Sequence, residues 1–277
     1  MTVELLHWNP ERPAVKGRLG ERFAPKRPLN NFGDLLGPVI SHELLRRSGI
    51  DTDEQGQADQ ASPAQDKRPQ ARLATVGSIL HFCRNGDTLW GTGRNGKISD
   101  RRHKFTSLDV RAVRGPLTRD FLRGRGIDAP SLFGDPGILV GHLWDREQLA
   151  AGHRLRPHRI VPNFHDFREV RDRMSAPTLD PRGDLWDVIG GIAASSLIVG
   201  SSLHGIIVAE SFGIPARLVL PRTETLFKYE DYYRGTGRRS FTPAPDVRTA
   251  LSWGGEPLPQ YDPAPLIDAF PRELWSS

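Results

Sequence analysis

The sequence predicts an α/β fold with two parallel β-sheets, each built in the manner of a Rossmann half. Short apolar runs of strand length alternate with segments whose apolar residues recur at helical spacing. Glycine repeatedly stands where a strand-like run gives way to a helical one. This alternation is typical of a parallel sheet, and it occurs in two series. We therefore expect two domains that face each other across a cleft, with ligands at the carboxyl ends of the strands.

The first series opens with a strand over residues 3–8, VELLHW. Residues 9–30 are rich in proline, arginine and lysine and predict a loop. Residues 30–50 predict a helix, because aliphatic side chains recur at helical spacing and the segment ends in arginines and a glycine. Residues 51–70 contain no aromatic residue and no aliphatic residue larger than alanine. They predict a mobile surface loop inside the first domain, because they have too little apolar surface to bury.

Strand-like material resumes directly after this loop. Residues 71–83 and 87–97 are strand-like and end in glycine-rich loops. Residues 108–113 predict a strand, and the helix after it begins at Pro116, since proline suits the first helical position. A further strand, SLFGD, ends at Asp135.

The second series repeats this order. Strands are predicted over residues 159–164, 196–201 and 216–220, and helices over 182–195 and 203–213. Near the end of the chain, APLIDAFPRELW predicts a closing helix. We therefore place the first domain at residues 1–145 and the second at residues 146–277.

The composition is that of an ordinary soluble protein. The chain has 277 residues, of which 37% are hydrophobic and 26% charged. One cysteine excludes a disulfide within the chain and disfavours a cysteine-based metal site. The first residues lack the basic and apolar regions of a signal peptide, and no apolar run is long enough for a membrane span. A cytoplasmic location is the expectation.

The basic balance of the chain suggests an anionic partner. The formal net charge is +5 and the pI is near 9.6. Such a charge suits an anionic substrate, a nucleic acid or an acidic membrane surface. Nucleic acid is disfavoured, because the basic residues are dispersed among acidic ones and no nucleic-acid-binding motif is present. The histidines form no HxH, HxxxH or HExxH pattern, so no metal site is expected.

The strongest candidate for chemistry is His204. It lies in SLIVGSSLHG, between a buried strand and the helix that follows it. The first turn of such a helix favours an anion, and Ser201 and Ser202 are candidate N-caps. A histidine at this place can exchange protons near neutral pH. The alternative is a histidine that only hydrogen-bonds a neighbouring loop.

Other candidates have equally plain structural alternatives. Arg114, at another strand-to-helix turn, can bind a carboxylate or phosphate, or it is a surface arginine. Glu210 can accept a hydrogen bond from a sugar hydroxyl, or it lies on the exposed face of its helix. The segment FKYEDYYRGTGR, residues 227–238, combines basic and tyrosine side chains that suit a sugar beside a phosphate; by pattern alone a surface loop is favoured. The aspartates of NFGD and FGDP are most simply helix caps.

Taken together and in order, six segments resemble the polysaccharide pyruvyl transferase family, especially bacterial ketal-pyruvate transferases of the xanthan type. The segments are NFGDLL, VGSILHFCRNGDTLWGTGRNGK, LDVRAVRGPLTRDFLRGRGI, FGDPGIL, GSSLHGIIVAESFGIPA and FKYEDYYRGTGR, within residues 31–239. The resemblance implies a GT-B-like fold and phosphoenolpyruvate as donor. It also implies a sugar of an exopolysaccharide repeat as acceptor, and a cyclic pyruvate ketal and phosphate as products.

The resemblance also implies roles for particular residues. It associates Arg114, His204 and Lys228 with the donor, assisted by Ser201 and Ser202 of the turn. The implied reaction also needs a proton-transfer group, for which His204 is the best candidate. The acceptor-binding candidates beside Glu210 are His165, Tyr229, Arg234 and Arg238. The strand of the second half departs from the family pattern, because PNFHDF has Asn163 where a histidine is expected.

No cofactor is implied beyond phosphoenolpyruvate as co-substrate. A lipid-linked oligosaccharide acceptor and peripheral association with the inner face of the membrane would suit the basic charge. Two alternatives remain open: a GT-B glycosyltransferase with a nucleotide-sugar donor, which the helix ending ESFGIPA also suits, and a non-catalytic module that binds glycans or anions.

Overall fold

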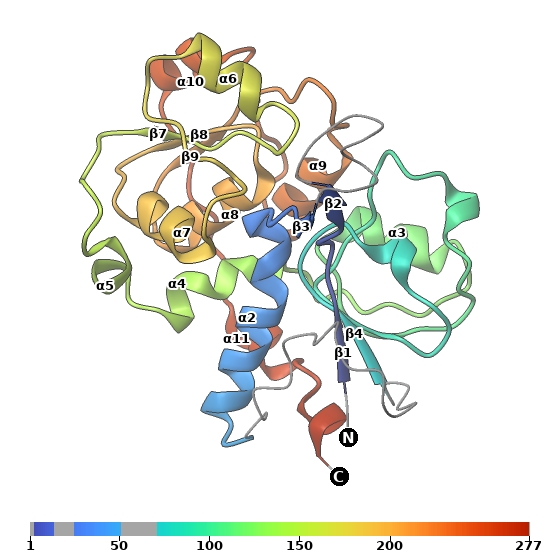
Figure 1. The fold of residues 1–277 in the computed structure, drawn as a ribbon. Helices are drawn as coiled ribbons and strands as arrows, with labels where there is room; N and C mark the ends of the chain where they lie inside the picture. Colours follow the sequence, from blue (N-terminus) through green and yellow to red (C-terminus); the bar gives the residue numbers. More distant parts are fainter. Residues whose placement is uncertain (1–2, 14–24, 51–70, 277) are drawn as a thin grey trace.

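The computed structural model describes residues 3–13, 25–50 and 71–276, and it contains two parallel sheets (Figure 1). The first sheet has the order β1-β4-β5-β6, with strands Val3–Leu6, Ala71–Ala74, Thr88–Trp90 and Asp109–Ala112. The second has the order β7-β8-β9, with strands Arg159–Ile160, Ile198–Gly200 and Ala216–Leu218. Every pairing within these two sheets is parallel. The predicted α/β class with parallel sheets is confirmed, and the loop predicted over residues 51–70 lies outside the described residues.

Helices connect and cover the strands. The α-helices are α2 (Phe32–Arg47), α3 (Pro116–Arg123), α4 (Val140–Leu143), α5 (Arg146–Ala150), α6 (Phe167–Arg173), α7 (Leu185–Ala193), α8 (Leu203–Ser211), α9 (Phe227–Gly235), α10 (Val247–Trp253) and α11 (Ala264–Asp268). Short 3₁₀ turns are η2 (Leu80–Phe82), η3 (Asp100–Arg102), η4 (Pro136–Leu139) and η5 (Arg272–Trp275). No described helix combines the length and the apolar character needed to cross a bilayer.

Two predictions about loops are wrong. Within residues 9–30, β2 (Glu11–Pro13) and β3 (Lys26–Pro28) form an antiparallel pair apart from both parallel sheets. Residues 227–235 of the predicted surface loop form helix α9, whose three tyrosines are at most 1% exposed. Tyr232 and Tyr233 follow Tyr229 by three and four residues, which places all three tyrosines on one face of the helix.

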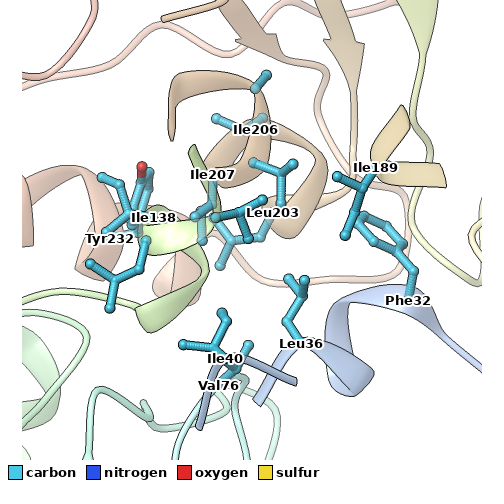
Figure 2. Packing of buried hydrophobic residues seen from close by; sticks show 14 of the residues in the cluster. Phe32, Leu36, Ile40, Val76, Ile138, Ile189, Leu203, Ile206, Ile207 and Tyr232 are labelled. Atoms are coloured by element: carbon cyan, nitrogen blue, oxygen red, sulfur yellow. The ribbon is translucent and has the colours of Figure 1, made fainter. Parts of the chain in front are cut away.

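One cluster of buried apolar side chains includes members of both parallel sheets. Leu73 belongs to the first sheet and Ile198 to the second, and both lie in this cluster. Helix α2 supplies much of it and packs against α7, η4 and β1 (Figure 1). Figure 2 shows Phe32 of α2 close to Ile189 of α7. The α2 helix, although it follows the first strand of the chain, therefore also packs against α7, a helix of the second half.

The C-terminal segment returns to the first sheet. Trp90 of β5 is fully buried and donates a hydrogen bond from Nε1 to the carbonyl oxygen of Leu266 at 2.8 Å. The ring of Trp90 also meets the ring of Phe270 edge to face, with centroids 4.8 Å apart. Tyr261 donates a hydrogen bond to the carbonyl oxygen of Phe133 at 2.8 Å. The predicted closing helix corresponds to the short α11 and η5, and this segment covers the first sheet. The predicted domain boundary between residues 145 and 146 stays a prediction.

Candidate active site

Segments from both halves of the chain meet around His204. Helix α2 begins against the ring of His204, because a Cβ atom on Gly33 would lie 2.0 Å from His204 Nδ1. The turn after β4 lies beside α2, where a Cβ atom on Gly77 would lie 3.3 Å from Asp34 Oδ1. The start of η4 also reaches the ring, through Asp135. The sequence predicts a ligand site at the carboxyl ends of parallel strands. The contacts around His204 lie in the turns that follow β4 and β8, which is where such a site is expected.

His204 stands in the first turn of α8, directly after strand β8. The N-cap of this helix is Ser202, whose hydroxyl accepts a hydrogen bond from the Gly205 N–H at 3.1 Å. This confirms Ser202 as an N-cap, and it fixes the turn that carries His204. The His204 side chain is 13% exposed. Its imidazole is therefore held on a rigid element and is almost enclosed.

The carboxylate of Asp135 lies near Nε2 of the His204 ring. The two side chains approach to 3.7 Å between His204 Nε2 and Asp135 Oδ2, which is longer than a hydrogen bond. Both atoms are buried, and neither has a hydrogen-bond partner within residues 3–13, 25–50 and 71–276. The other oxygen of Asp135 accepts from the Gly137 N–H at 3.0 Å and so caps η4. The capping prediction for FGDP is thus confirmed, and the same carboxylate also places a negative charge beside His204 Nε2.

A second carboxylate, Asp34, lies on the α2 side of the histidine. Asn31 is the N-cap of α2, and Asp34 stands inside the first turn, so the capping prediction for NFGD is wrong. Asn31 Nδ2 donates to Asp34 Oδ2 at 2.5 Å. Burial raises the pKa of Asp34 above its ordinary value, and the charges of His204 and Lys228 act in the opposite direction. The site therefore contains a carboxyl group that holds its proton more tightly than a solvated one.

Lys228 reaches the same region from the first turn of α9. Its side chain is 19% exposed, and Nζ lies 3.2 Å from Glu224 Oε2. Glu224 also pairs with Lys97, at 2.5 Å between Nζ and Oε1. Burial lowers the pKa of Lys228, while the charge of Glu224 raises it. Two ammonium groups share one carboxylate here, which leaves a net positive charge that suits an anionic ligand.

Arg114 is buried, so the alternative of a surface arginine is wrong, and its role in donor binding stays a prediction. Its side chain is fully buried, and its guanidinium donates from Nε to Asp231 Oδ2 at 3.1 Å. It also donates to Ser78 Oγ at 2.7 Å and to the carbonyl oxygen of Arg94 at 2.9 Å. A bound anion would have to displace one of these partners. In this structure Arg114 therefore joins β6 to α9, and it does not present a free guanidinium to a ligand.

Three of the predicted acceptor-binding residues belong to an internal network. Glu210 accepts from the Tyr232 hydroxyl at 2.6 Å and from both terminal nitrogens of Arg238, at 2.6 and 2.8 Å. The Arg238 guanidinium also lies 4.0 Å from the centroid of the Tyr233 ring. Tyr229 donates to the carbonyl oxygen of Ser201 at 2.7 Å. Because these groups are satisfied inside the protein, they hold α9 on α8.

The remaining candidates lie outside the His204 cluster. The Ser201 hydroxyl is bound to Asp166 Oδ2 at 2.7 Å and accepts from the Asn163 N–H at 3.1 Å. His165 is exposed and meets Phe164 edge to face. Arg234 is exposed and pairs with Glu230. Within the described ranges, no three His, Cys, Asp or Glu side chains are grouped closely enough to hold a metal ion.

Sequence reasoning missed Asp34 and Asp135 as members of the site. Both were available as aspartates directly after a glycine, at the start of a helix and at the end of a strand. Their approach to one histidine depends on packing between α2, η4 and α8, which no local pattern indicates.

Comparisons with known proteins point to one family. Residues 90–221 match the family model for polysaccharide pyruvyl transferase. A segment of 136 residues, 47% of this chain, is 32% identical to 41% of the succinoglycan biosynthesis protein ExoV of Rhizobium meliloti. A segment of 152 residues, 52% of this chain, is 29% identical to 51% of an uncharacterized protein of Acanthamoeba polyphaga mimivirus. The chain thus spans about half the length, or less, of the curated relatives it matches.

A solved structure of an uncharacterized protein from Klebsiella pneumoniae aligns with this chain over 77% of this chain and 89% of the Klebsiella chain. The TM-score is 0.44 and the sequence identity is 11%.

Proposed function

We propose that this chain, whose residues 90–221 match the polysaccharide pyruvyl transferase family, is a member of that family and adds a pyruvate ketal to a sugar of an exopolysaccharide repeat unit. The donor in this proposal is phosphoenolpyruvate, and phosphate is released. The observation that carries the proposal is His204, enclosed between the Asp135 carboxylate and the start of α2 within the matched segment. The name of the relative ExoV, a succinoglycan biosynthesis protein, supports an exopolysaccharide product.

The reaction needs two additions to one carbon atom. A first sugar hydroxyl attacks C2 of phosphoenolpyruvate and loses its proton, while the methylene carbon gains a proton and becomes a methyl group. A second hydroxyl of the same sugar then attacks C2, and the C–O bond to phosphate breaks. The second hydroxyl proton leaves with the phosphate. The products are a cyclic ketal and inorganic phosphate, so atoms and charges balance without a cofactor.

The site offers groups for both proton movements. His204 Nδ1 faces the start of α2, and we assign it the proton that goes to the methylene carbon. Asp135 acts on Nε2 and stabilises the charged imidazole, so it is a positioning residue. Asp34 is the acceptor for the proton of the first hydroxyl, because a carboxyl whose pKa is raised by burial is a stronger base than a solvated one.

Cationic side chains bind the donor in this proposal. Phosphoenolpyruvate carries nearly three negative charges, whose burial without partners would be prohibitive. A helix N-terminus such as that of α8 contributes about 0.3–1 kcal/mol, and a hydrogen bond to a charged group contributes about 1.5–3 kcal/mol. Lys228, with Lys97 beside it, therefore supplies most of the donor affinity, and α8 adds to it. Arg114 supports the site from behind through Asp231 and Ser78.

The wider arrangement completes the proposal. The two sheets form a GT-B-like pair, the acceptor is a lipid-linked oligosaccharide, and the protein works in the cytoplasm at the inner face of the membrane. The basic pI near 9.6 supports an acidic membrane surface as its neighbour.

Phosphate release tests the proposal. The protein is incubated with phosphoenolpyruvate and a panel of lipid-linked oligosaccharides, and free phosphate is measured. The wild-type protein should release phosphate only with a matching acceptor. His204→Gln should lose about 10²–10⁴ in turnover, the usual share of a general acid–base group, while it still binds phosphoenolpyruvate.

The control and the contrary outcomes are distinct. His142→Gln alters an exposed histidine of helix α4 and should leave turnover unchanged. Wild-type turnover in His204→Gln would remove the histidine from the chemistry. Binding of phosphoenolpyruvate without phosphate release, across the whole panel, would instead indicate a binding module.

A further inference from the structure

A separate hollow opens at the carboxyl ends of the second sheet. Its volume is about 390 Å³, and it lies among β7, β8, β9, α6 and the start of α10. The apolar part of its lining includes Ile160, Val170, Val219 and Val247. The polar part includes Asp166 and Ser201. His204 is not part of this lining, so the hollow is a second candidate site at the carboxyl ends of the same strands.

One buried polar group in the lining of the hollow is a fixed carboxylate. Asp166 is 5% exposed, and its Oδ2 accepts from Asn163 Nδ2 at 2.8 Å and from Ser201 Oγ at 2.7 Å. The N–H of Arg222 lies 3.5 Å from the same oxygen. The other oxygen, Oδ1, receives no hydrogen bond from the described part of the chain. A buried acceptor is thus held rigidly by one oxygen, and its second oxygen is left for a ligand.

The charges around the hollow disfavour an anionic ligand. Glu169 pairs with both Arg173 and Arg222 at the rim. These two arginines are therefore partly neutralised, and the remaining charged residues of the lining, Asp246 and Arg248, have opposite signs. The carboxylate of Asp166 would repel an anion that came close to it. A neutral ligand with hydroxyl donors is favoured, because a hydroxyl can bind the open carboxylate oxygen while carbon-bound hydrogens pack on the apolar lining.

We propose that this hollow is a subsite for a pyranose ring of the acceptor glycan, next to the sugar that reacts at His204. A pyranose has both features that the lining requires, hydroxyl donors and an apolar face of ring hydrogens. The β8–α8 turn joins the two places, because Gly200 and Ser201 line the hollow and His204 follows three residues later. This inference rests on the proposed function, since it assigns the hollow to the acceptor of that reaction.

Asp166→Asn is the sharpest variant for this subsite. Its amide oxygen can take the place of Oδ2 and keep the hydrogen bonds from Asn163 and Ser201. Its NH₂ group then replaces the open acceptor Oδ1 with a donor. The matched control is Asp172→Asn in helix α6, where the aspartate side chain is 61% exposed and pairs with Arg171.

Sugar binding is measured without catalysis, by saturation-transfer NMR with methyl glucopyranoside, methyl galactopyranoside and methyl mannopyranoside. At least one should receive saturation from the wild-type protein, from Asp172→Asn and from His204→Gln. Asp166→Asn should weaken that binding at least tenfold. In the phosphate-release assay, the same variant should raise the acceptor KM and leave the phosphoenolpyruvate KM unchanged.

A second variant covers the case in which Asp166→Asn does not fold. Met174→Trp fills part of the hollow from its edge and should also abolish saturation transfer. The subsite is refuted if no methyl glycoside binds the wild-type protein, or if folded Asp166→Asn or Met174→Trp binds it as well as the wild type. Sugar binding without phosphate release would refute the pyruvyl transfer and leave the subsite standing.

Discussion

Asp34, Asp135 and Asp231 are carboxylates that the fold uses in three ways. Asp231 is fully buried and balances the charge of Arg114. Asp135 caps η4 with one oxygen and faces His204 with the other. Asp34 destabilises the folded protein when it is charged, because burial disfavours the charged carboxylate and raises the pKa of Asp34.

Asp34→Asn should stabilise the folded protein at neutral pH. A raised pKa means that the folded state binds a proton more tightly than the unfolded chain, so stability falls as pH rises from the ordinary value of 3.8 through the folded pKa. The asparagine variant lacks this loss and can keep the hydrogen bond from Asn31. We expect its Tm to exceed that of the wild type by a few degrees at pH 7, since 1 kcal/mol corresponds to about 2–4 °C for a chain of this size.

The pH dependence separates this cause from a general packing effect. Thermal melts between pH 3 and pH 8 should show the Tm difference shrinking toward zero as pH falls below about 4, where aspartate is protonated in both states. A Tm difference that is constant across this range would contradict the desolvation of Asp34. Asp172→Asn, on the exposed part of α6, should follow the wild type at every pH.

For single residues, sequence analysis predicted which positions lie at functional turns better than it predicted which residues they contact. His204 and the Ser202 cap were predicted, because a strand-to-helix turn and its N-cap are local patterns. Arg114 and Glu210 were assigned to ligands, and the structure shows them paired inside the protein. Asp231, the partner of Arg114, lies 117 residues away in the sequence, so no local pattern indicates the pair.

Among the elements, α3 and α9 make the closest approach around the site. A Cβ atom on Gly115, the N-cap of α3, would lie 1.8 Å from the carbonyl oxygen of Asp231 in α9. A Cβ atom on Gly235 would lie 2.2 Å from the carbonyl oxygen of Arg114. The two glycines therefore let the backbones touch, and this contact brings Lys228 and Asp231 of α9 to the first half of the chain.

Gly115→Ala should separate these two helices. The new methyl group meets backbone, which cannot yield as a side-chain tip does, so we expect a loss of about 1–3 kcal/mol or more in the free energy of unfolding. Denaturant unfolding measures this loss. Gly124→Ala, at the other end of α3, is the matched control, because its φ of −62° suits alanine and its nearest non-neighbouring atom would be 3.3 Å away. Equal stability of the two variants would contradict the close approach.

Elements with a strong local period were predicted well. Helices α2 and α7 lie within their predicted ranges, because their apolar residues recur on one face. Helix α9 was missed because its buried face is built from tyrosines, whose hydroxyls made the segment look polar. The β2–β3 pair was missed because its strands are three residues long and contain proline and charged residues.

At the scale of the whole molecule, the two halves are connected by an early segment that packs on the second half and by a late segment that packs on the first. Helix α2 packs against α7 of the second half, and the C-terminal segment returns to the first sheet through Trp90. The parallel sheets were predictable from the alternation of strands and helices. The crossing of these two segments was not, because it depends on which apolar face meets which after the sheets have formed.

Leu266→Ala should destabilise the protein by about 2–5 kcal/mol, the usual cost of removing a buried leucine side chain. Leu266 is fully buried against the first sheet, although it stands near the end of the sequence. Leu258→Ala is the control, since Leu258 is 41% exposed and should change stability by no more than about 0.5 kcal/mol. Chemical unfolding of both variants tests this, and a near-neutral Leu266→Ala would mean that the C-terminal segment is not part of the core.

The return of the C-terminal segment also has a consequence for folding during synthesis. Domains usually fold in the order in which they leave the ribosome, the N-terminal one first. Here β5 is translated early, but the Trp90 side chain finds its hydrogen-bond acceptor in Leu266 and an aromatic neighbour in Phe270, near the other end of the chain. Part of the apolar surface of the first sheet therefore stays uncovered until almost the whole described chain has left the ribosome. Chaperones have their longest opportunity to bind this chain during that interval.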